Sequence, residues 1–129
     1  MSIRHNSGLV AIVDDDESVQ RALQDLIESD GLSTLCFDSA EQFLDYDAQS
    51  KAACLIADIR MPGMSGLELQ AKLKAERCRI PIIFITAHGD SKMRMHAIRE
   101  GAVEFLGKPF DDGVFLEIVH AALARWRND

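Results

Sequence analysis

The sequence predicts an α/β fold, a doubly wound parallel sheet of five strands with helices on both faces. Short β-branched apolar runs alternate with amphipathic segments five times, and the connections between them are short. Such regular alternation is typical of a parallel sheet with right-handed crossovers. The 129 residues suit a single domain, long enough to bury a core without disulfides or structural metal.

Each expected strand is an apolar run too short for a helix, as in strands buried on both faces. The strands are expected over residues 9–13, 32–37, 54–57, 80–86 and 103–106. The first begins after Gly8 and ends at three aspartates. Pro81 lies near the start of the fourth, where a missing N–H is tolerated.

The expected helices lie between these strands, where apolar residues recur at helical spacing. The first follows Glu17 and continues to Gly31, a residue suited to the position just past a helix end. Capping boxes are expected to start the second and third helices, at Ser39 with Gln42 and at Ser65 with Glu68.

The last two helices begin at aspartates. Asp90 is expected to cap a fourth helix that ends at Gly101, and Asp111 or Asp112 to begin the fifth. The fifth carries one apolar stripe, formed by Phe115, Ile118, Val119, Ala122, Leu123 and Trp126.

Composition excludes several classes of protein. The net charge of −7, without a basic stripe, argues against direct nucleic-acid contact by this domain. No apolar run approaches the roughly 20 residues of a membrane span. Residues 1–8 lack the apolar centre of a signal peptide, so we expect an N-terminal extension followed by a domain over residues 9–127. Three scattered cysteines suggest reduced thiols and a cytoplasmic location.

The stretch from residue 54 to residue 66 is the centre of the predicted site. Its apolar run ends in Asp58, and the turn at Pro62 and Gly63 follows. Ligands of open parallel sheets bind at the carboxyl ends of the strands, so Asp58 lies where chemistry is expected.

Three carboxylates should meet at this edge if the first and third strands are neighbours: Asp14, Asp15 and Asp58. Like charges so close raise each other's pKa unless a cation lies among them. Such an acidic cluster suits Mg²⁺ or Mn²⁺. The simpler alternative is that residues 14–16 form a solvated loop that caps the first helix.

Two further strand ends add a hydroxyl and an ammonium group. Thr86 ends the fourth strand and Lys108 follows the fifth. Together with the acids they form a set suited to phosphoryl transfer, with Asp58 as the nucleophile and Lys108 and Thr86 binding phosphoryl oxygens. Taken singly, Thr86 could be an ordinary β-branched strand residue and Lys108 a solvated loop lysine.

The order and spacing of Asp14, Asp15, Asp58, Thr86 and the pair Lys108-Pro109 resemble the receiver domain of two-component response regulators. The resemblance covers residues 9–126, and the runs 58–66, 86–90 and 101–110 are particularly similar to the FixJ-like subgroup. It implies a flavodoxin-like sheet with strand order 2-1-3-4-5. It also implies that Asp58 accepts a phosphoryl group from a sensor histidine kinase.

The resemblance further implies a ligand set for the metal. Asp15, Asp58 and the backbone carbonyl of Arg60 would ligate Mg²⁺, with Asp14 acting through bound water. A cis peptide bond before Pro109 would direct Lys108 into the site.

A switch between Thr86 and Phe105 is also expected. Phe105 stands where many receivers carry tyrosine, so its ring can rotate inward but cannot donate a hydroxyl hydrogen bond. We expect phosphorylation to draw Thr86 inward and Phe105 to rotate from an exposed to a buried position. The face formed by the fourth helix, fifth strand and fifth helix should then favour homodimerisation, with apolar groups at Met93, Met95, Val103 and Phe105.

The expected output is transcription control through an appended DNA-binding domain, as is frequent in this subgroup. A stand-alone receiver that acts by protein–protein contact is the alternative. A flavin-binding electron carrier would need a phosphate loop where residues 14–16 are acidic. A haloacid-dehalogenase-like phosphatase would need an acid at the position of Arg60. The chain is therefore expected to be a signalling module whose only chemistry is its own phosphorylation and dephosphorylation.

Overall fold

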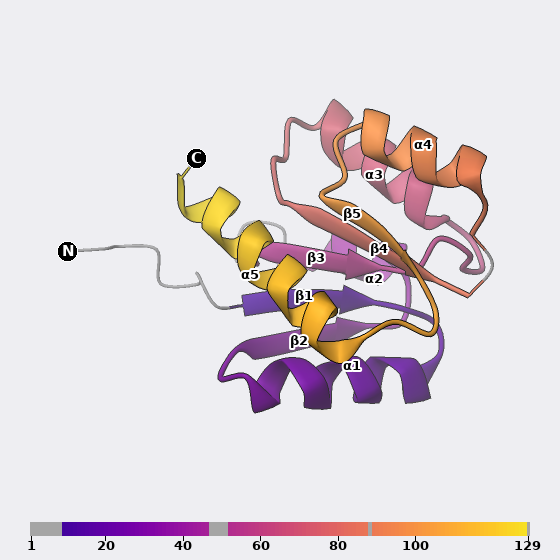
Figure 1. The fold of residues 1–129 in the computed structure, drawn as a ribbon. Coiled ribbons are helices and arrows are strands. Elements are labelled where there is room, and N and C mark those ends of the chain that lie inside the picture. The colour runs from indigo at the N-terminus through magenta and orange to yellow at the C-terminus, as the bar shows by residue number, and fades with distance from the viewer. Residues whose placement is uncertain (1–8, 47–51, 88, 129) are drawn as a thin grey trace.

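One parallel sheet forms the centre of the computed structural model, which describes residues 9–46, 52–87 and 89–128 (Figure 1). The strands lie in the spatial order β2 (Ser33–Phe37), β1 (Leu9–Val13), β3 (Cys54–Ala57), β4 (Ile82–Thr86) and β5 (Glu104–Gly107). Both the fold class and the predicted strand order are confirmed. The expected extension at residues 1–8 lies outside the described residues.

Five helices cover the two faces of the sheet among the described residues. They are α1 (Glu17–Ser29), α2 (Ala40–Asp45), α3 (Gly66–Ala75), α4 (Ser91–Arg99) and α5 (Asp112–Asn128). Helices α1 and α5 pack on one face, and α2, α3 and α4 on the other (Figure 1). The element boundaries differ from the predicted ones by one or two residues, because the ends of helices and strands are the least sharply determined positions.

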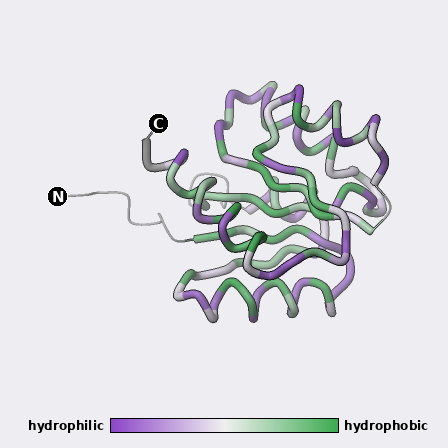
Figure 2. Tube along the Cα trace, viewed as in Figure 1, coloured by the Kyte–Doolittle hydropathy of each residue, from purple (hydrophilic) through white to green (hydrophobic). Residues whose placement is uncertain are grey.

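The core consists of two apolar layers, one on each side of the sheet. Along β1, Val10 and Ile12 face α1 and α5, whereas Ala11 and Val13 face the other three helices. Successive strand residues point to opposite faces, so a strand covered on both sides is apolar throughout. Figure 2 shows the apolar strands at the centre and the hydrophilic residues on the outer sides of the helices.

The two predicted capping boxes have different outcomes. At α3 the box is confirmed: Ser65 Oγ accepts from the Glu68 N–H at 3.1 Å, and Glu68 Oε1 accepts from the Ser65 N–H at 2.9 Å. At α2 only half of the box forms, in which Ser39 Oγ accepts from the Gln42 N–H. The Gln42 side chain reaches one residue further and accepts from the Asp38 N–H at 2.9 Å.

The predicted apolar face around α4 and β5 is wrong in its composition. Phe105 is only 5% exposed, and Val103 packs in the layer of α1 and α5 on the opposite side of the sheet from Met93. Phe105 lies within β5 and faces the layer of α2, α3 and α4, whereas Val103 lies just before the strand and is not bound by its alternation. The exposed apolar side chains of α4 are Met95 and Ile98.

The structure also bears on the expectations about membrane spans and cysteines. No described helix has both the length and the apolar character needed to cross a membrane. Cys36, Cys54 and Cys78 are free thiols, and Cys54 is fully buried in the central strand β3.

Candidate functional site

The predicted site residues lie where adjacent strands end, and backbone hydrogen bonds to neighbouring strands fix them there. The Asp14 N–H donates to the Phe37 carbonyl at 3.1 Å, and the Asp58 N–H donates to the Val13 carbonyl at 3.1 Å. The Lys108 N–H donates to the Thr86 carbonyl at 2.9 Å. The carboxyl edge of the sheet therefore holds these residues in a rigid frame.

Three carboxylates meet at this edge. One oxygen from each of Asp14, Asp15 and Asp58 lies within 4.8 Å of the other two. Asp14 is buried, Asp58 is half-buried and Asp15 is exposed, so the cluster opens to solvent on one side. Oxygen ligands with room for water are the donors that Mg²⁺ prefers, so these residues fit a hard divalent cation.

The electrostatics of the cluster favour such a cation. The pKa of Asp14 is raised to about 6, mainly by burial and in smaller part by the nearby charges of Asp58 and Asp15. The Asp16 N–H, which donates to Asp14 Oδ1 at 2.8 Å, and the Lys108 ammonium lower the same pKa. Since the raising effects are larger, the ionised form of Asp14 is disfavoured in this structure, and a nearby cation would stabilise it.

Lys108 is the one cation of the described residues that ion-pairs with this cluster. Its Nζ lies 3.8 Å from Asp14 Oδ2, and the peptide bond between Lys108 and Pro109 is cis. Thr86 is 1% exposed at the end of β4. The hydroxyl and the ammonium therefore lie on the same edge of the sheet as the acids.

The third consecutive aspartate has a separate role. Asp16 caps α1, because its carboxylate accepts from the Ser18 N–H at 2.9 Å and from Ser18 Oγ at 2.6 Å. These hydrogen bonds lower the pKa of Asp16. The capping interpretation of residues 14–16 thus holds for Asp16, while Asp14 and Asp15 join Asp58.

The loop after β3 is tightly constrained. The Arg60 N–H donates to Asp58 Oδ1 at 3.3 Å, and the Met64 N–H donates to Glu41 Oε2 of α2 at 3.0 Å. A Cβ at Gly66 would lie 2.2 Å from the Asp58 carbonyl oxygen, so only glycine fits there. The start of α3 is thereby pressed against the backbone of Asp58.

Gln20 is a site residue that the sequence reasoning missed. This α1 side chain is 8% exposed, and its Nε2 lies 2.6 Å from the Asp14 carbonyl oxygen and 2.8 Å from Asp38 Oδ1. It joins the end of β1 to the end of β2. The available signal was a glutamine at helical spacing from Leu23 and Ile27 on a buried stripe, where a polar group needs partners.

Thr86 and Phe105 are in position to influence each other. A Cβ at Gly89 would lie 2.6 Å from both the Phe105 ring and the Thr86 methyl group, so the two side chains converge on this glycine. The ring of Phe105 also packs at a tilt on Phe84, with centroids 6.4 Å apart. It therefore occupies the inward position, and not the exposed one from which rotation was expected.

Comparisons with known proteins agree with this geometry. The family model of the response regulator receiver domain matches residues 10–120. Response regulator protein TodT of Pseudomonas putida is 48% identical over 124 residues, which cover 94% of this chain and 55% of TodT. Transcriptional regulatory protein FixJ of Azorhizobium caulinodans is 41% identical over 116 residues, covering 90% of this chain and 55% of FixJ.

A solved structure gives the same result for the fold. The crystal structure of FixJ-N has a TM-score of 0.82 at 40% identity and covers 90% of this chain and 93% of that chain. The chain spans about half the length of the curated relatives that it matches. From the family match and these identities, we conclude that the chain belongs to the receiver domains of two-component response regulators.

Proposed function

We propose that Asp58 accepts a phosphoryl group from the phosphohistidine of a sensor histidine kinase. The observation that carries this proposal is the meeting of Asp14, Asp15 and Asp58 at one strand edge, with Lys108 paired to the cluster. A carboxylate nucleophile, an acidic metal site and a cation are the parts that phosphoryl transfer needs.

The reaction divides into two balanced steps. An Asp58 carboxylate oxygen attacks phosphorus, the P–N bond of the phosphohistidine breaks, and the electron pair remains on the imidazole. In the second step water attacks phosphorus, the P–O bond to Asp58 breaks and inorganic phosphate leaves. The chain is thus a signalling module whose chemistry is confined to its own acyl phosphate.

Asp15, Asp58 and the Arg60 carbonyl would hold Mg²⁺ or Mn²⁺, with Asp14 acting through a bound water molecule. When bound, the cation would neutralise charge on the phosphoryl oxygens. Lys108 would bind one phosphoryl oxygen and thereby replace part of its contact with Asp14, which is long at 3.8 Å.

Thr86 would couple phosphorylation to the conformation of the surrounding surface. Its hydroxyl would bind a phosphoryl oxygen, and the Phe105 ring would hold its inward position behind it. This pair would stabilise one arrangement of the face formed by α4, β5 and α5. We propose homodimerisation through this face, where Met95 is 60% exposed and Ile98 39% exposed.

The output is proposed for a longer protein. FixJ is named a transcriptional regulatory protein, and this chain covers 55% of it. We propose that a domain over residues 9–127 controls transcription through an appended DNA-binding domain in the cytoplasm, without touching nucleic acid itself. Action as a stand-alone receiver through protein contacts is the second candidate.

Labelling by a small acyl phosphate tests the proposal. Incubation with acetyl phosphate and Mg²⁺ should give a phosphorylated species on a phosphate-affinity gel in the wild-type protein and in Asp16→Asn, which keeps the cap. It should be absent in Asp58→Asn and without Mg²⁺. Undiminished labelling of Asp58→Asn would refute the assignment, and steady turnover of nitrophenyl phosphate would favour a phosphatase.

A further inference from the structure

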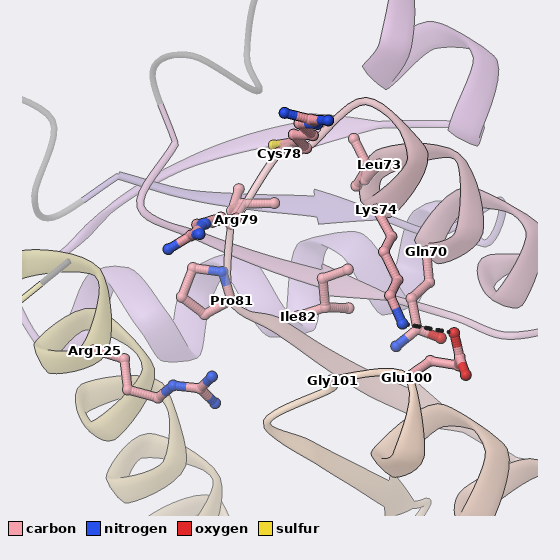
Figure 3. A pocket seen from close by; sticks show the side chains of 12 residues that line it. Gln70, Leu73, Lys74, Cys78, Arg79, Pro81, Ile82, Glu100, Gly101 and Arg125 are labelled. Carbon is pink, nitrogen blue, oxygen red and sulfur yellow. Dashed lines mark hydrogen bonds and ion pairs between the residues drawn. The ribbon is translucent and has the colours of Figure 1, made fainter.

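A second candidate site lies at the opposite, amino-terminal edge of the sheet. A cavity of about 620 Å³ is bounded by the end of α3, the segment before β4, the end of α4 and the last turns of α5 (Figure 3). Pockets of 300–1,000 Å³ suit small organic ligands. None of the residues that line this cavity belongs to the acidic edge.

The charge of the cavity is positive in an acidic protein. Lys74, Arg77, Arg79 and Arg125 line it, and Glu100 is its only acidic lining residue. Glu100 is already paired with Lys74 at 2.9 Å. The three arginines make no ion pair with any residue in the described ranges, so they remain available to an anion.

Gln70 lines one end of the cavity with a buried amide. The side chain is 3% exposed, and its Nε2 donates to the Ala97 carbonyl at 3.0 Å, which fixes the orientation of the amide. Its Oε1 is buried and accepts no hydrogen bond from the described residues. A buried acceptor left unpaired costs about 1–3 kcal/mol, but Gln70 Oε1 has almost no exposed surface, so a ligand in the cavity does not reach it while the amide keeps this orientation.

Figure 3 shows how these groups lie. The Gln70 amide, the Lys74 ammonium and the Glu100 carboxylate lie together at one end, and Arg125 extends from α5 on the other side of Pro81. Between them the wall is apolar, formed by Leu73, Ile80, Pro81 and Ile82. Cations and an apolar wall together suit a ligand with an anionic group and a carbon skeleton.

Arg77 is held in an unusual conformation at the mouth of the cavity. Its φ of +60° is in the left-handed region, and its N–H donates to the Lys74 carbonyl at 3.0 Å at the end of α3. Glycine is the usual residue at such a helix end. An arginine here is therefore strained, and it adds a cation to the cavity.

We propose that this cavity binds a small organic phosphate of about mononucleotide size. The arginine side chains hold the phosphate, because the guanidinium fork matches phosphate oxygens. Leu73, Ile80 and Pro81 cover the carbon skeleton of the ligand. This site is separate from the proposed phosphoryl acceptor.

The test uses AMP and glycerol phosphate as probes, titrated into Mg²⁺-free protein and followed by calorimetry and by backbone amide chemical shifts. At least one probe should bind saturably and shift amides around Arg77, Arg79 and Gly101. Adenosine and glycerol should bind at least about tenfold more weakly, since they lack the charged group.

Two variants with the same change in charge make the test specific. Arg77→Gly should fold well, because glycine adopts a positive φ freely, and should weaken binding about tenfold. Arg21→Gln removes an exposed arginine of α1 and should leave binding unchanged. The proposal is overturned if neither probe binds, if the shifts lie around Asp58, or if both variants weaken binding equally.

Discussion

The two edges of the sheet differ in charge and in how their side chains are held. At the carboxyl edge, Asp14, Asp58 and Lys108 each bond through the backbone to a neighbouring strand. At the amino edge, Arg77, Arg79 and Arg125 are exposed and extend from a helix end, a connecting segment and a helix. Strands hold chemical groups more precisely than loops do. The carboxyl edge is thus suited to a reaction, and the amino edge to binding.

The strongest test of the rigid carboxyl edge is Gly66→Ala. The added Cβ would lie 2.2 Å from the Asp58 carbonyl oxygen, so the backbone must move, and we expect a loss of about 3 kcal/mol or more in unfolding free energy. Urea denaturation measures it. The control is Gly107→Ala, where a Cβ would meet nothing within 4 Å, and an equal loss in both variants would contradict this explanation.

The unbalanced charge of the acidic edge predicts a pH-dependent stability. The pKa of Asp14 in the folded protein is about 6, above its ordinary value of 3.8. The stability that Asp14 contributes is therefore fully present below pH 3.8 and is lost as the pH rises through about 6.

In metal-free protein, the stability of Asp14→Asn relative to the wild type should consequently increase between pH 4.5 and 7.5, by about 2 kcal/mol. Urea denaturation in a chelating buffer at both pH values measures this gap. Added Mg²⁺ should narrow this difference in stability at pH 7.5, because a bound cation stabilises the ionised carboxylates of the wild type. A gap that stays constant with pH would show that burial does not perturb Asp14.

Much of this edge was predictable because its signals are local. A short apolar run followed by an acid, as at Val13 with Asp14 and at Ala57 with Asp58, identifies a strand and the polar group at its end. Strand order and the pairing of β1 with β3 then bring the acids together. The predicted phosphoacceptor, metal ligands and switch residues remain predictions about chemistry.

The remaining features depend on contacts between distant segments. Gln20 reaches Asp38, eighteen residues away, and nothing in the spacing reveals that partner. The inward position of Phe105 depends on the space beside Gly89. The amino-edge cavity has no motif, because Gln70, Arg77 and Arg125 come from separate elements without a common period.

Metal binding should distinguish two adjacent aspartates. Asp15→Ala removes a proposed direct ligand and should weaken Mg²⁺ binding at least about tenfold, since even outer partners of metal sites contribute that much. Asp16→Asn makes the same change in charge but retains the cap of α1, so its affinity should stay near that of the wild type. Calorimetric titration with MgCl₂ measures both, and equal affinities would exclude Asp15 as a ligand.

The smallest expected effect concerns the amino edge. Arg77→Gly relieves a left-handed arginine, so the unfolding free energy should rise by about 0.5–1 kcal/mol. Thermal unfolding of this variant beside Arg79→Gly, whose φ is not positive, measures the difference. If Arg77→Gly is the less stable of the two, the Arg77 side chain stabilises the fold by contacts that offset its strain.

Chemical trapping of the acyl phosphate tests the role of Asp58 most directly. Borohydride reduces an aspartyl phosphate to homoserine, so peptide mass spectrometry of protein treated with acetyl phosphate, Mg²⁺ and borohydride locates the phosphorylated residue. We expect homoserine at position 58 and unchanged aspartates at Asp14 and Asp15. Homoserine at position 14 or 15, or unmodified Asp58 in protein that carries phosphate, would contradict the proposed mechanism.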